Sequence, residues 1–565
     1  MKRLLLLSVT LFSFVMIQAA PVDREIAHKK AEAFLGKKVA MQKSSNRATG
    51  LKEAPTYYIF NATDGKGFVI LSGEDRLSSM IGYSYTGHMA SEGDMPDALK
   101  LFLNTYQQYV EAYRLGEAND VEDVSDIFTT RRADSDNYLC KSKWGQDAPY
   151  NTLCPVIDDK QCPTGCVATA LAQILYYWKW PITGAGYGNA TDSKGATHHG
   201  TLEHTYNWST MLNTTEENAK SAEAAEAVAQ LLYDCGLAVG MTYGTDGSKA
   251  GTPIKAMYTN FGYIPTSLRT QMRECFASDV EWLSTIAAEI DAGRPVYESA
   301  ESATQGGKDS SGHAFIIDGY DKDGNLHVNW GWDSDYDGFF AITKMNPAGY
   351  EYTVDQTIIT GIEPAKNGET GEPTEYPYMK NAPVANQKGK IKKNVEFTIT
   401  LSNIWNKNGN SHTWSTSIGL FDISGSMVAD VKSGRSQSIS LDSYYGIPET
   451  ASEIPCKLDG TYPDGNYALR AIFKESGSKE WILPDMVGGL VNNAVYVKLS
   501  GNDIEFTDGT DYINAATGIN ILRSSSQLSV EPVRYFDLQG REVNGTQKGV
   551  LIRRQGSEVR KVMVK

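Results

Sequence analysis

Cysteine, histidine and proline are scarce in this sequence. Its 565 residues include only seven Cys, eight His and 20 Pro. Seven Cys are too few for a scaffold built from disulfides, and because the number is odd, at least one thiol is left unpaired within the chain. Long apolar runs are also missing after residue 20, so no later segment is expected to span a membrane.

Positive charge falls short of negative charge. The chain has 53 Lys and Arg against 68 Asp and Glu, a formal net charge of −15. Such a chain is a poor match for a phosphate backbone, so nucleic acid is not expected to be the main partner. Apolar residues make up 41% of the chain, too many for a disordered protein, and the length predicts several domains.

The first 20 residues have the pattern of a secretory signal peptide. Lys2 and Arg3 form a basic head, the apolar run Leu4 to Ile17 follows, and small residues close the segment. The apolar run is too short to cross a bilayer, which takes about 20 residues. We therefore predict that residues 1–20 are a signal peptide and that the protein is secreted or attached to the cell surface.

Helices and strands are both predicted before residue 133. Apolar residues recur at helical spacing over 24–35 and 97–115, whereas 56–60 and 67–72 are typical of strands. The acidic stretch 117–126 then leads to Arg131 and Arg132. We predict an α+β domain over 21–132 that ends at this polar boundary.

The rest of the chain is expected to divide into four segments. Residues 133–365 hold six of the seven Cys and seven of the ten Trp. A stretch rich in Gly, Pro, Glu and Thr makes 366–379 a linker, and the strand-like alternation of 380–500 predicts a β-sandwich. Residues 501–565 are predicted to form a small β-rich domain with a basic end.

Cys166 is the strongest candidate for a reactive thiol. The apolar residues of 167–178 recur at helical spacing and Pro181 ends the run, so Cys166 is predicted at a helix N-terminus. The helix dipole and the unpaired N–H groups there favour a thiolate, which is the nucleophilic form of cysteine. A small buried cysteine is the structural alternative.

A thiolate also needs a partner that transfers protons, and two histidines compete for this role. His313 precedes an apolar strand and follows the polar stretch 305–312, so it can face a cleft. His327 lies inside the next predicted strand, on the same face as Asn329 and opposite Trp330. Its default interpretation is a histidine that is hydrogen-bonded within the fold.

Several motifs together resemble the streptopain family of papain-like cysteine proteases. They are 164–170 (TGCVATA), 312–319 (GHAFIIDG) and 327–332 (HVNWGW), with 144–151 (WGQDAPYN) and 240–244 (GMTYG) in support. Their order and separations are compatible with the family. The resemblance covers about 133–363 and implies an α+β papain-like catalytic domain, preceded by an inhibitory α+β pro-domain over 21–132.

The resemblance also implies roles for individual residues. Cys166 would be the nucleophile and His313 its proton-transferring partner, while Gln146 and the backbone N–H of Cys166 would form the oxyanion hole. Asn329 and Trp330 match the pair that orients and shields the imidazole. Ser248 and Gly312 are expected to line the substrate site, and no metal or cofactor is predicted.

The implied activity is that of a secreted cysteine endopeptidase made as a zymogen. Its partners would be protein substrates and its own pro-domain, acting as an intramolecular inhibitor. The C-terminal residues resemble the sorting domains of the type IX secretion system, which would add outer-membrane secretion machinery as a partner. The alternative for these residues is a β-module that only caps the preceding domain.

Other thiols and one acidic loop leave alternatives open. Cys154 and Cys162 could pair with Cys140, with each other or with nothing, and a metal site of 154, 162 and 166 has poor spacing. Residues 333–338 match the first half of a calcium loop, but Lys344 stands where the bidentate Glu is expected. A polar turn explains this stretch better.

Two alternatives to the protease hypothesis follow. The papain-like domain could be a degenerate scaffold in a non-enzymatic surface-binding protein that acts through its β-rich C-terminal domains. Alternatively, the same Cys and His could pass the acyl group to another acceptor, as amidases and transpeptidases do.

Overall fold

The computed structural model describes most of the chain after the predicted signal peptide. The residues described are 21–44, 55–89, 95–115, 138–245, 247–251, 253–302, 312–341, 354–406, 412–433, 437–441, 452–458, 460, 462–475, 477–517, 534–536, 542–543, 549–555 and 558–564. In these ranges we find no helix that is both long and apolar enough to cross a membrane. The chain forms two compact units, Met1–Arg273 with Trp282–Pro373, and Glu274–Glu281 with Thr374–Lys565.

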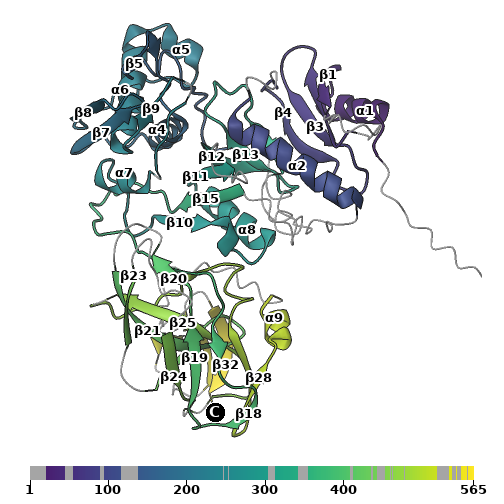
Figure 1. The fold of residues 1–565 in the computed structure, drawn as a ribbon, viewed down its shortest axis with the longest axis vertical. Coiled ribbons are helices and arrows are strands. Elements are labelled where there is room, and N and C mark those ends of the chain that lie inside the picture. The colour runs from purple at the N-terminus through teal and green to yellow at the C-terminus, as the bar shows by residue number, and fades with distance from the viewer. Residues whose placement is uncertain are drawn as a thin grey trace, which may run out of the picture. The chain divides into compact units, whose positions relative to one another are not determined.

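A ten-stranded antiparallel sheet runs through the first unit (Figure 1). Its strands, in spatial order, are β1 (Val39–Ser44), β2 (Tyr57–Ala62), β3 (Phe68–Ser72), β4 (Met80–Ser84), β14 (Gly338–Phe340), β13 (Leu326–Asn329), β12 (Gly312–Tyr320), β11 (Val296–Ser302), β15 (Val354–Thr360) and β10 (Arg269–Met272). The first four come from the predicted pro-domain and the other six from the predicted catalytic domain. The two groups join where β4 pairs with β14, with Tyr83 opposite Phe339.

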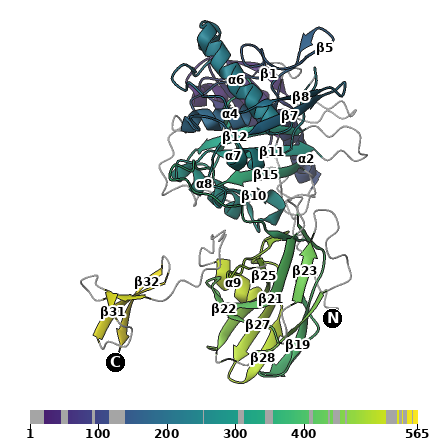
Figure 2. The ribbon, with the colours of Figure 1, turned by 90° about the vertical axis from the view of Figure 1, so that its left-hand side faces the viewer.

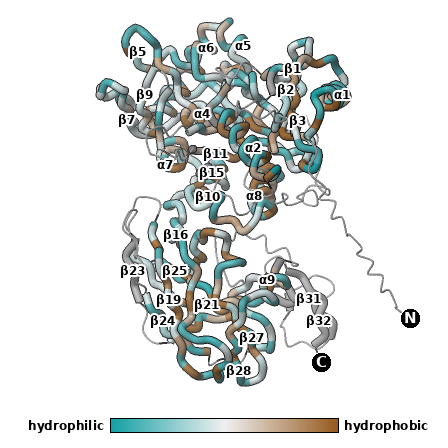
Figure 3. The backbone as a smooth tube through the Cα atoms, turned by 45° about the vertical axis from the view of Figure 1, so that its right-hand side comes forward, coloured by the Kyte–Doolittle hydropathy of each residue, from teal (hydrophilic) through white to brown (hydrophobic). Residues whose placement is uncertain are grey.

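Helices α1 (Arg24–Leu35) and α2 (Asp97–Leu115) agree with the ranges predicted from hydrophobic spacing. The side chain of Asp23 caps α1 by accepting a hydrogen bond of 2.7 Å from the N–H of Glu25. Gly36 ends α1 with a φ of 64°, in the left-handed region that favours glycine. Figure 3 shows hydrophobic and hydrophilic residues mixed along α2, as expected for a helix with one buried face.

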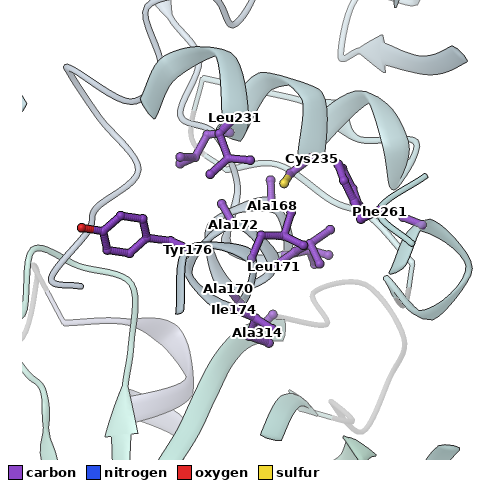
Figure 4. Packing of buried hydrophobic residues seen from close by; sticks show 14 of the residues in the cluster. Ala168, Ala170, Leu171, Ala172, Ile174, Tyr176, Leu231, Cys235, Phe261 and Ala314 are labelled. Carbon is purple, nitrogen blue, oxygen red and sulfur yellow. The ribbon is translucent and has the colours of Figure 1, made fainter. Parts of the chain in front are cut away.

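Helix α4 (Cys166–Trp178) begins at the expected nucleophile. Its residues 167–176 are all buried. It packs between helix α6 (Ala222–Ala238) and strand β12. In Figure 4, Leu231 and Cys235 of α6 lie on one side of α4 and Ala314 of β12 lies on the other. The remaining elements of this region are β5 (Val156–Ile157), β6 (Lys160–Gln161), β7 (Tyr187–Asp192), β8 (Thr197–Thr201), α5 (Thr215–Ala219), β9 (Thr242–Tyr243), α7 (Ile254–Thr259), the 3₁₀ turn Arg273–Cys275 and α8 (Asp279–Asp291).

Side chains alternate between the two faces of β12. Ala314 and Ile316 belong to the core cluster that contains α4. Phe315 points to the opposite face and begins a row of aromatic rings that reaches α2 of the predicted pro-domain. The ring centroids are 4.8 Å apart between Phe315 and Trp330, 5.4 Å between Trp330 and Phe340, and 5.6 Å between Phe340 and Phe102.

The second unit is rich in strands (Figure 2). They are β16 (Pro377–Met379), β17 (Val384–Ala385), β18 (Gly389–Lys392), β19 (Phe397–Leu401), β20 (Ile404–Asn406), β21 (His412–Phe421), β22 (Met427–Asp430), β23 (Gln437–Leu441), β24 (Ser452–Cys456), β25 (Gly465–Glu475), β26 (Asp485–Met486), β27 (Val495–Ser500) and β28 (Asp503–Thr507), followed by α9 (Thr510–Thr517). Separate sheets bury Ile399, Ile418 and Leu469 in one cluster, as a sandwich requires.

Two predicted boundaries of this unit need correction. Residues 377–379, at the end of the segment predicted as a linker, form strand β16. This strand pairs with β20 and β26, so it belongs to the second unit. The predicted boundary at residue 500 cuts a hairpin in which Ser500 pairs with Asp503. Both differences arise because a short strand carries a weaker pattern in the sequence than the polar residues beside it. A separate four-stranded sheet follows, made of β29 (Arg534–Phe536), β30 (Glu542–Val543), β31 (Gly549–Gln555) and β32 (Glu558–Val564).

Glu298 on β11 should make the stability of the first unit depend on pH. Its side chain is fully buried and accepts a hydrogen bond of 3.1 Å from Nε2 of Gln356. Burial raises the pKa of the Glu298 carboxyl to about 8, far above the value of about 4.3 expected in an unfolded chain. Between these two values the unfolded state binds fewer protons, so the free energy of unfolding should fall as the pH rises.

We therefore expect Glu298→Gln to gain stability relative to its parent as the pH is raised from about 5 to about 9. The measurement is thermal unfolding of both chains in a Cys166→Ala background, which removes the predicted nucleophile. The exposed Glu203→Gln is a matched control that should shift the melting temperature equally at all pH values. A difference between Glu298→Gln and its parent that does not change with pH would contradict this account.

Candidate active site

Cys166 is the first residue of α4, as its sequence context predicts. Its thiol is half-buried, and the residue before it, Gly165, has a φ of 86°. A Cβ atom on Gly165 would lie 2.8 Å from Cε of Met241 and 3.0 Å from Cβ of Ser248, so the close packing also requires glycine. Cys166 therefore sits at a helix N-terminus on a tightly packed turn, where a nucleophile was predicted.

His313 on β12 lies beside Cys166. Burial is the largest single influence on the pKa of Cys166 and would raise it, but the charge of the imidazole, a hydrogen bond to it, and the N–H groups of Ala314 and Val167 together outweigh burial. The pKa of the Cys166 thiol is therefore lowered from its ordinary value. Such a shift is typical of a thiolate paired with an imidazolium.

The backbone carbonyl of Trp330 fixes the imidazole. Nε2 of His313 is 2.9 Å from that oxygen, and since a carbonyl only accepts, Nε2 carries the hydrogen. Proton exchange with the thiol then falls to Nδ1. The rings of Trp330, Phe315 and Trp332 have centroids 6.3, 6.4 and 6.4 Å from that of His313. These three rings lie around the buried imidazole, and the shielding role of Trp330 stays a prediction.

Asn329 is buried directly beside Trp330, and its amide is fully engaged. Nδ2 donates to the carbonyl of Ser142 at 2.8 Å and to Oε1 of Gln173 at 3.1 Å. Oδ1 accepts from Nε2 of Gln173 and from the N–H of Gly331, both at 3.0 Å. Within the described chain these partners hold the backbone on either side of Trp330, so the predicted effect of Asn329 on the imidazole would pass through Trp330.

Gln146 lies next to the turn that precedes the nucleophile. Its carbonyl accepts a hydrogen bond of 3.0 Å from the N–H of Thr164, and its side chain is partly buried. The hydroxyl of Thr164 lies 2.8 Å from that of Thr169 on α4, which ties this turn to the helix. Gln146 is thus held close to the N-terminus of α4, where an oxyanion hole would form.

The two expected substrate-site residues flank the pair from different elements. Oγ of Ser248 donates to the carbonyl of Pro163 at 3.3 Å, and its Cβ lies beside Gly165. Gly312 is the exposed first residue of β12 and pairs with Glu301 of β11. Each is therefore adjacent in space or sequence to Cys166 or His313, and their role in binding stays a prediction.

Comparison with known proteins gives the family. Residues 144–340 match the peptidase C10 family, and residues 19–110 match the Spi protease inhibitor family. Streptopain of Streptococcus pyogenes is 28% identical over 405 residues, which cover 64% of this chain and 98% of streptopain. The chain belongs to the peptidase C10 family. The predicted resemblance to streptopain is confirmed, and the chain is a cysteine-type peptidase.

Three further proteins are similar to this chain. The thiol protease/hemagglutinin PrtT of Porphyromonas gingivalis is 31% identical over 402 residues, which are 66% of this chain but only 45% of PrtT. A fragment of prointerpain A from Prevotella intermedia is 30% identical and covers 57% of this chain and 99% of the fragment, with a TM-score of 0.47. Active interpain A is 34% identical, covers 40% of this chain and 94% of interpain A, and has a TM-score of 0.36.

Five of the other six cysteines differ from Cys166 in the direction of their pKa shift. All seven cysteines are free thiols in the structure. Burial raises the pKa of Cys140, Cys162 and Cys235, and it raises the pKa of Cys154 and Cys456 to about 12. These thiols favour the neutral form, so Cys166 is distinguished by charge and not by exposure alone.

The competing histidine has a structural partner. Nδ1 of His327 is 2.6 Å from Oδ1 of Asp318, and its ring stacks on Tyr138 with centroids 3.9 Å apart. This arrangement fits the default interpretation of His327 as a histidine satisfied within the fold. Of the histidines in the polar region near residue 200, His198 pairs with Asp192 and His204 with Asp234, each at 2.9 Å.

The stretch that resembles half a calcium loop uses its carboxylates within the protein. Oδ1 of Asp337 accepts the N–H of Trp330 at 2.9 Å, and Asp333 accepts from the hydroxyl of Thr215. Lys344 lies outside the described residues. Among those described, no group of three or more His, Cys, Asp or Glu side chains could hold a metal ion.

Sequence reasoning missed two residues that organise the site, Gln173 and Asp337. Burial raises the pKa of Asp337 to about 7. Its side chain accepts a hydrogen bond from the N–H of Trp330, and the carbonyl of Trp330 accepts one from His313. Gln173 interrupts the apolar face of α4 with a polar side chain. That interruption is visible in the sequence and was the signal that could have found it.

Replacement of Gln146 should slow the reaction without abolishing it. If its amide stabilises the oxyanion, Gln146→Ala should lower kcat by about 10²–10³ with a smaller change in KM, because the lost hydrogen bond is made in the transition state. The measurement is steady-state hydrolysis of a peptide substrate. The control Gln161→Ala removes a glutamine on the β5–β6 hairpin and should keep kcat. Equal kcat for Gln146→Ala and the unaltered enzyme would exclude the assigned role.

Proposed function

We propose that this protein is a secreted cysteine endopeptidase made as a zymogen. Residues 21–132 would be its inhibitory pro-domain and residues 133–365 its catalytic domain. The proposal is carried by one observation: His313 lowers the pKa of Cys166 at the start of α4, whereas burial raises that of five other thiols. Family membership supplies the class of reaction, and this pair supplies its residues.

The proposed reaction is acyl transfer to water. The Cys166 thiolate attacks the peptide carbonyl carbon, and the N–H of Cys166 and the amide of Gln146 stabilise the resulting oxyanion. The C–N bond breaks as the imidazolium of His313 protonates the leaving amine. His313 then removes a proton from water, hydroxide adds to the thioester, and Cys166 leaves as a thiolate while the imidazole keeps the proton.

Contacts between the two domains support inhibition by the pro-domain. Strand β4 extends the catalytic sheet at β14, and α2 lies over the face that carries Phe315 and Trp330. The N–H of His88 donates to the carbonyl of Asp335 at 2.7 Å, in the turn that follows Trp332. The proposed pro-domain therefore contacts elements that adjoin the imidazole of His313. A zymogen must block or displace such catalytic groups to stay inactive.

Export and processing remain part of the proposal. The signal peptide over 1–20 and the processing point at Arg131 and Arg132 lie outside the described residues. Secretion machinery as a partner rests on the C-terminal resemblance, and the four strands of 534–564 would belong to that sorting domain. No observation favours the non-enzymatic alternative.

Wild-type protein should remove its own pro-domain and cleave casein under reducing conditions, whereas Cys166→Ala should do neither. The reason is that every bond cleavage passes through the Cys166 thioester. Gel electrophoresis and mass spectrometry would follow both products, and an added amine would reveal transfer to acceptors other than water. Cys275→Ala is the matched control and should mature normally. Maturation of pure Cys166→Ala, or an inert wild type, would disprove the proposal.

A further inference from the structure

The helix that carries the nucleophile contains a buried polar side chain two turns further on. Gln173 is 0% exposed. Positions 166, 169 and 173 recur at the i, i+3 and i+7 spacing of one helix face, so Cys166, Thr169 and Gln173 form one stripe. A buried amide is retained only where its hydrogen bonds are made, so its partners indicate its purpose.

The first partner is the amide of Asn329 at the end of β13. Nε2 of Gln173 donates to Oδ1 of Asn329 at 3.0 Å, and Nδ2 of Asn329 donates to Oε1 of Gln173 at 3.1 Å. The two amides thus form a reciprocal pair, in which each donates once and accepts once. Such a pair fixes both the distance and the orientation of the two elements.

The second partner is the segment that leads to Gln146. Oε1 of Gln173 accepts the hydroxyl of Ser142 at 2.8 Å and the N–H of Trp144 at 3.4 Å. Asn329 adds a hydrogen bond of 2.8 Å to the carbonyl of Ser142. The side chain of Gln173 therefore contacts both the end of β13 and the segment that precedes Gln146.

The link to the imidazole passes through Trp330. Oδ1 of Asn329 also accepts the N–H of Gly331, so the amide pair holds the residues on both sides of Trp330. Gly331 has a φ of 71°, and a Cβ atom on it would lie 3.0 Å from Cγ2 of Thr169, which shows how closely this turn lies on α4. The carbonyl between these anchors is the one that accepts from His313.

We propose that Gln173 is a positioning residue that sets the distance between nucleophile, imidazole and oxyanion hole. The inference rests on the proposed roles of Cys166 and His313. Gln173 touches none of the reacting atoms, but it joins the helix that carries Cys166 to two other segments. One is the end of β13, where the carbonyl of Trp330 holds His313, and the other is the segment that leads to Gln146. Because reactivity depends steeply on such placement, loosening this junction should slow the chemical step more than substrate binding.

The test uses the active enzyme obtained by maturation of the full-length protein. Gln173→Met keeps the length of the side chain but removes every hydrogen bond. Gln173→Glu keeps an acceptor for Ser142 and replaces the donor to Asn329 with a carboxyl oxygen. The paired swap Gln173→Asn with Asn329→Gln restores an amide pair of the same combined length. Tyr176→Phe is the matched control, because it deletes buried hydrogen bonds of α4 to the carbonyl of Met211 and to Asn213, away from the site.

We expect Gln173→Met to lower kcat by about 10- to 100-fold with KM within about threefold, since the misplaced groups affect the transition state more than the substrate complex. The acid limb of the pH profile of kcat/KM should move to higher pH, as the imidazolium loses its hold on the thiolate. The paired swap should recover at least about tenfold of the loss. Tyr176→Phe should keep both kcat and the pH profile.

Two results would overturn the inference. One is a kcat for Gln173→Met within about twofold of wild type. The other is a loss of kcat that follows the melting temperature in Gln173→Met and Tyr176→Phe alike, without a shift of the pH profile. If Gln173→Met fails to fold, Gln173→Glu decides by the same criteria. An inactive wild type would instead disprove the proposed function, so the two failures are distinguishable.

Discussion

The attraction between the Cys166 thiolate and the His313 imidazolium is the interaction on which the rest of the site depends. Burial opposes it, since a charged sulfur is costly away from water. The pair forms because the start of α4 and the start of β12 bring both groups together. Backbone N–H groups also lower the pKa of Cys166, in addition to the effect of the imidazole. Without that placement Cys166 would behave as the other buried thiols do, which favour the neutral form.

The end of β13 connects the imidazole of His313 with the proposed pro-domain. The carbonyl of Trp330 holds the imidazole, and its ring belongs to the aromatic row that reaches Phe102 of α2. Strand β4 extends the same sheet through β14. Because the pro-domain completes the sheet that carries His313, its presence is coupled to the catalytic face through packing and backbone pairing.

Local patterns in the sequence predicted the helices whose limits depend on neighbouring residues. The apolar spacing gave the limits of α1 and α2, and the run after Cys166 gave the start of α4. The family motifs led to the residues now found around the imidazole. The polar interruption of α4 marks Gln173 in the sequence, but the partners of Gln173 and Asp337 could not be predicted, because their hydrogen bonds join segments brought together only by folding. The ten-stranded sheet depends equally on the long-range pairing of β4 with β14.

The most direct test of the central claim is the pH dependence of Cys166 alkylation by iodoacetamide, measured by peptide mass spectrometry with the other six cysteines as internal references. In wild type, Cys166 should react with a midpoint well below the ordinary thiol pKa of about 8.5, while the buried cysteines stay unreacted. In His313→Ala the midpoint should rise, because the imidazole no longer opposes burial and only the N–H groups of Ala314 and Val167 still do. An ordinary midpoint in wild type, or one unchanged in His313→Ala, would contradict the account.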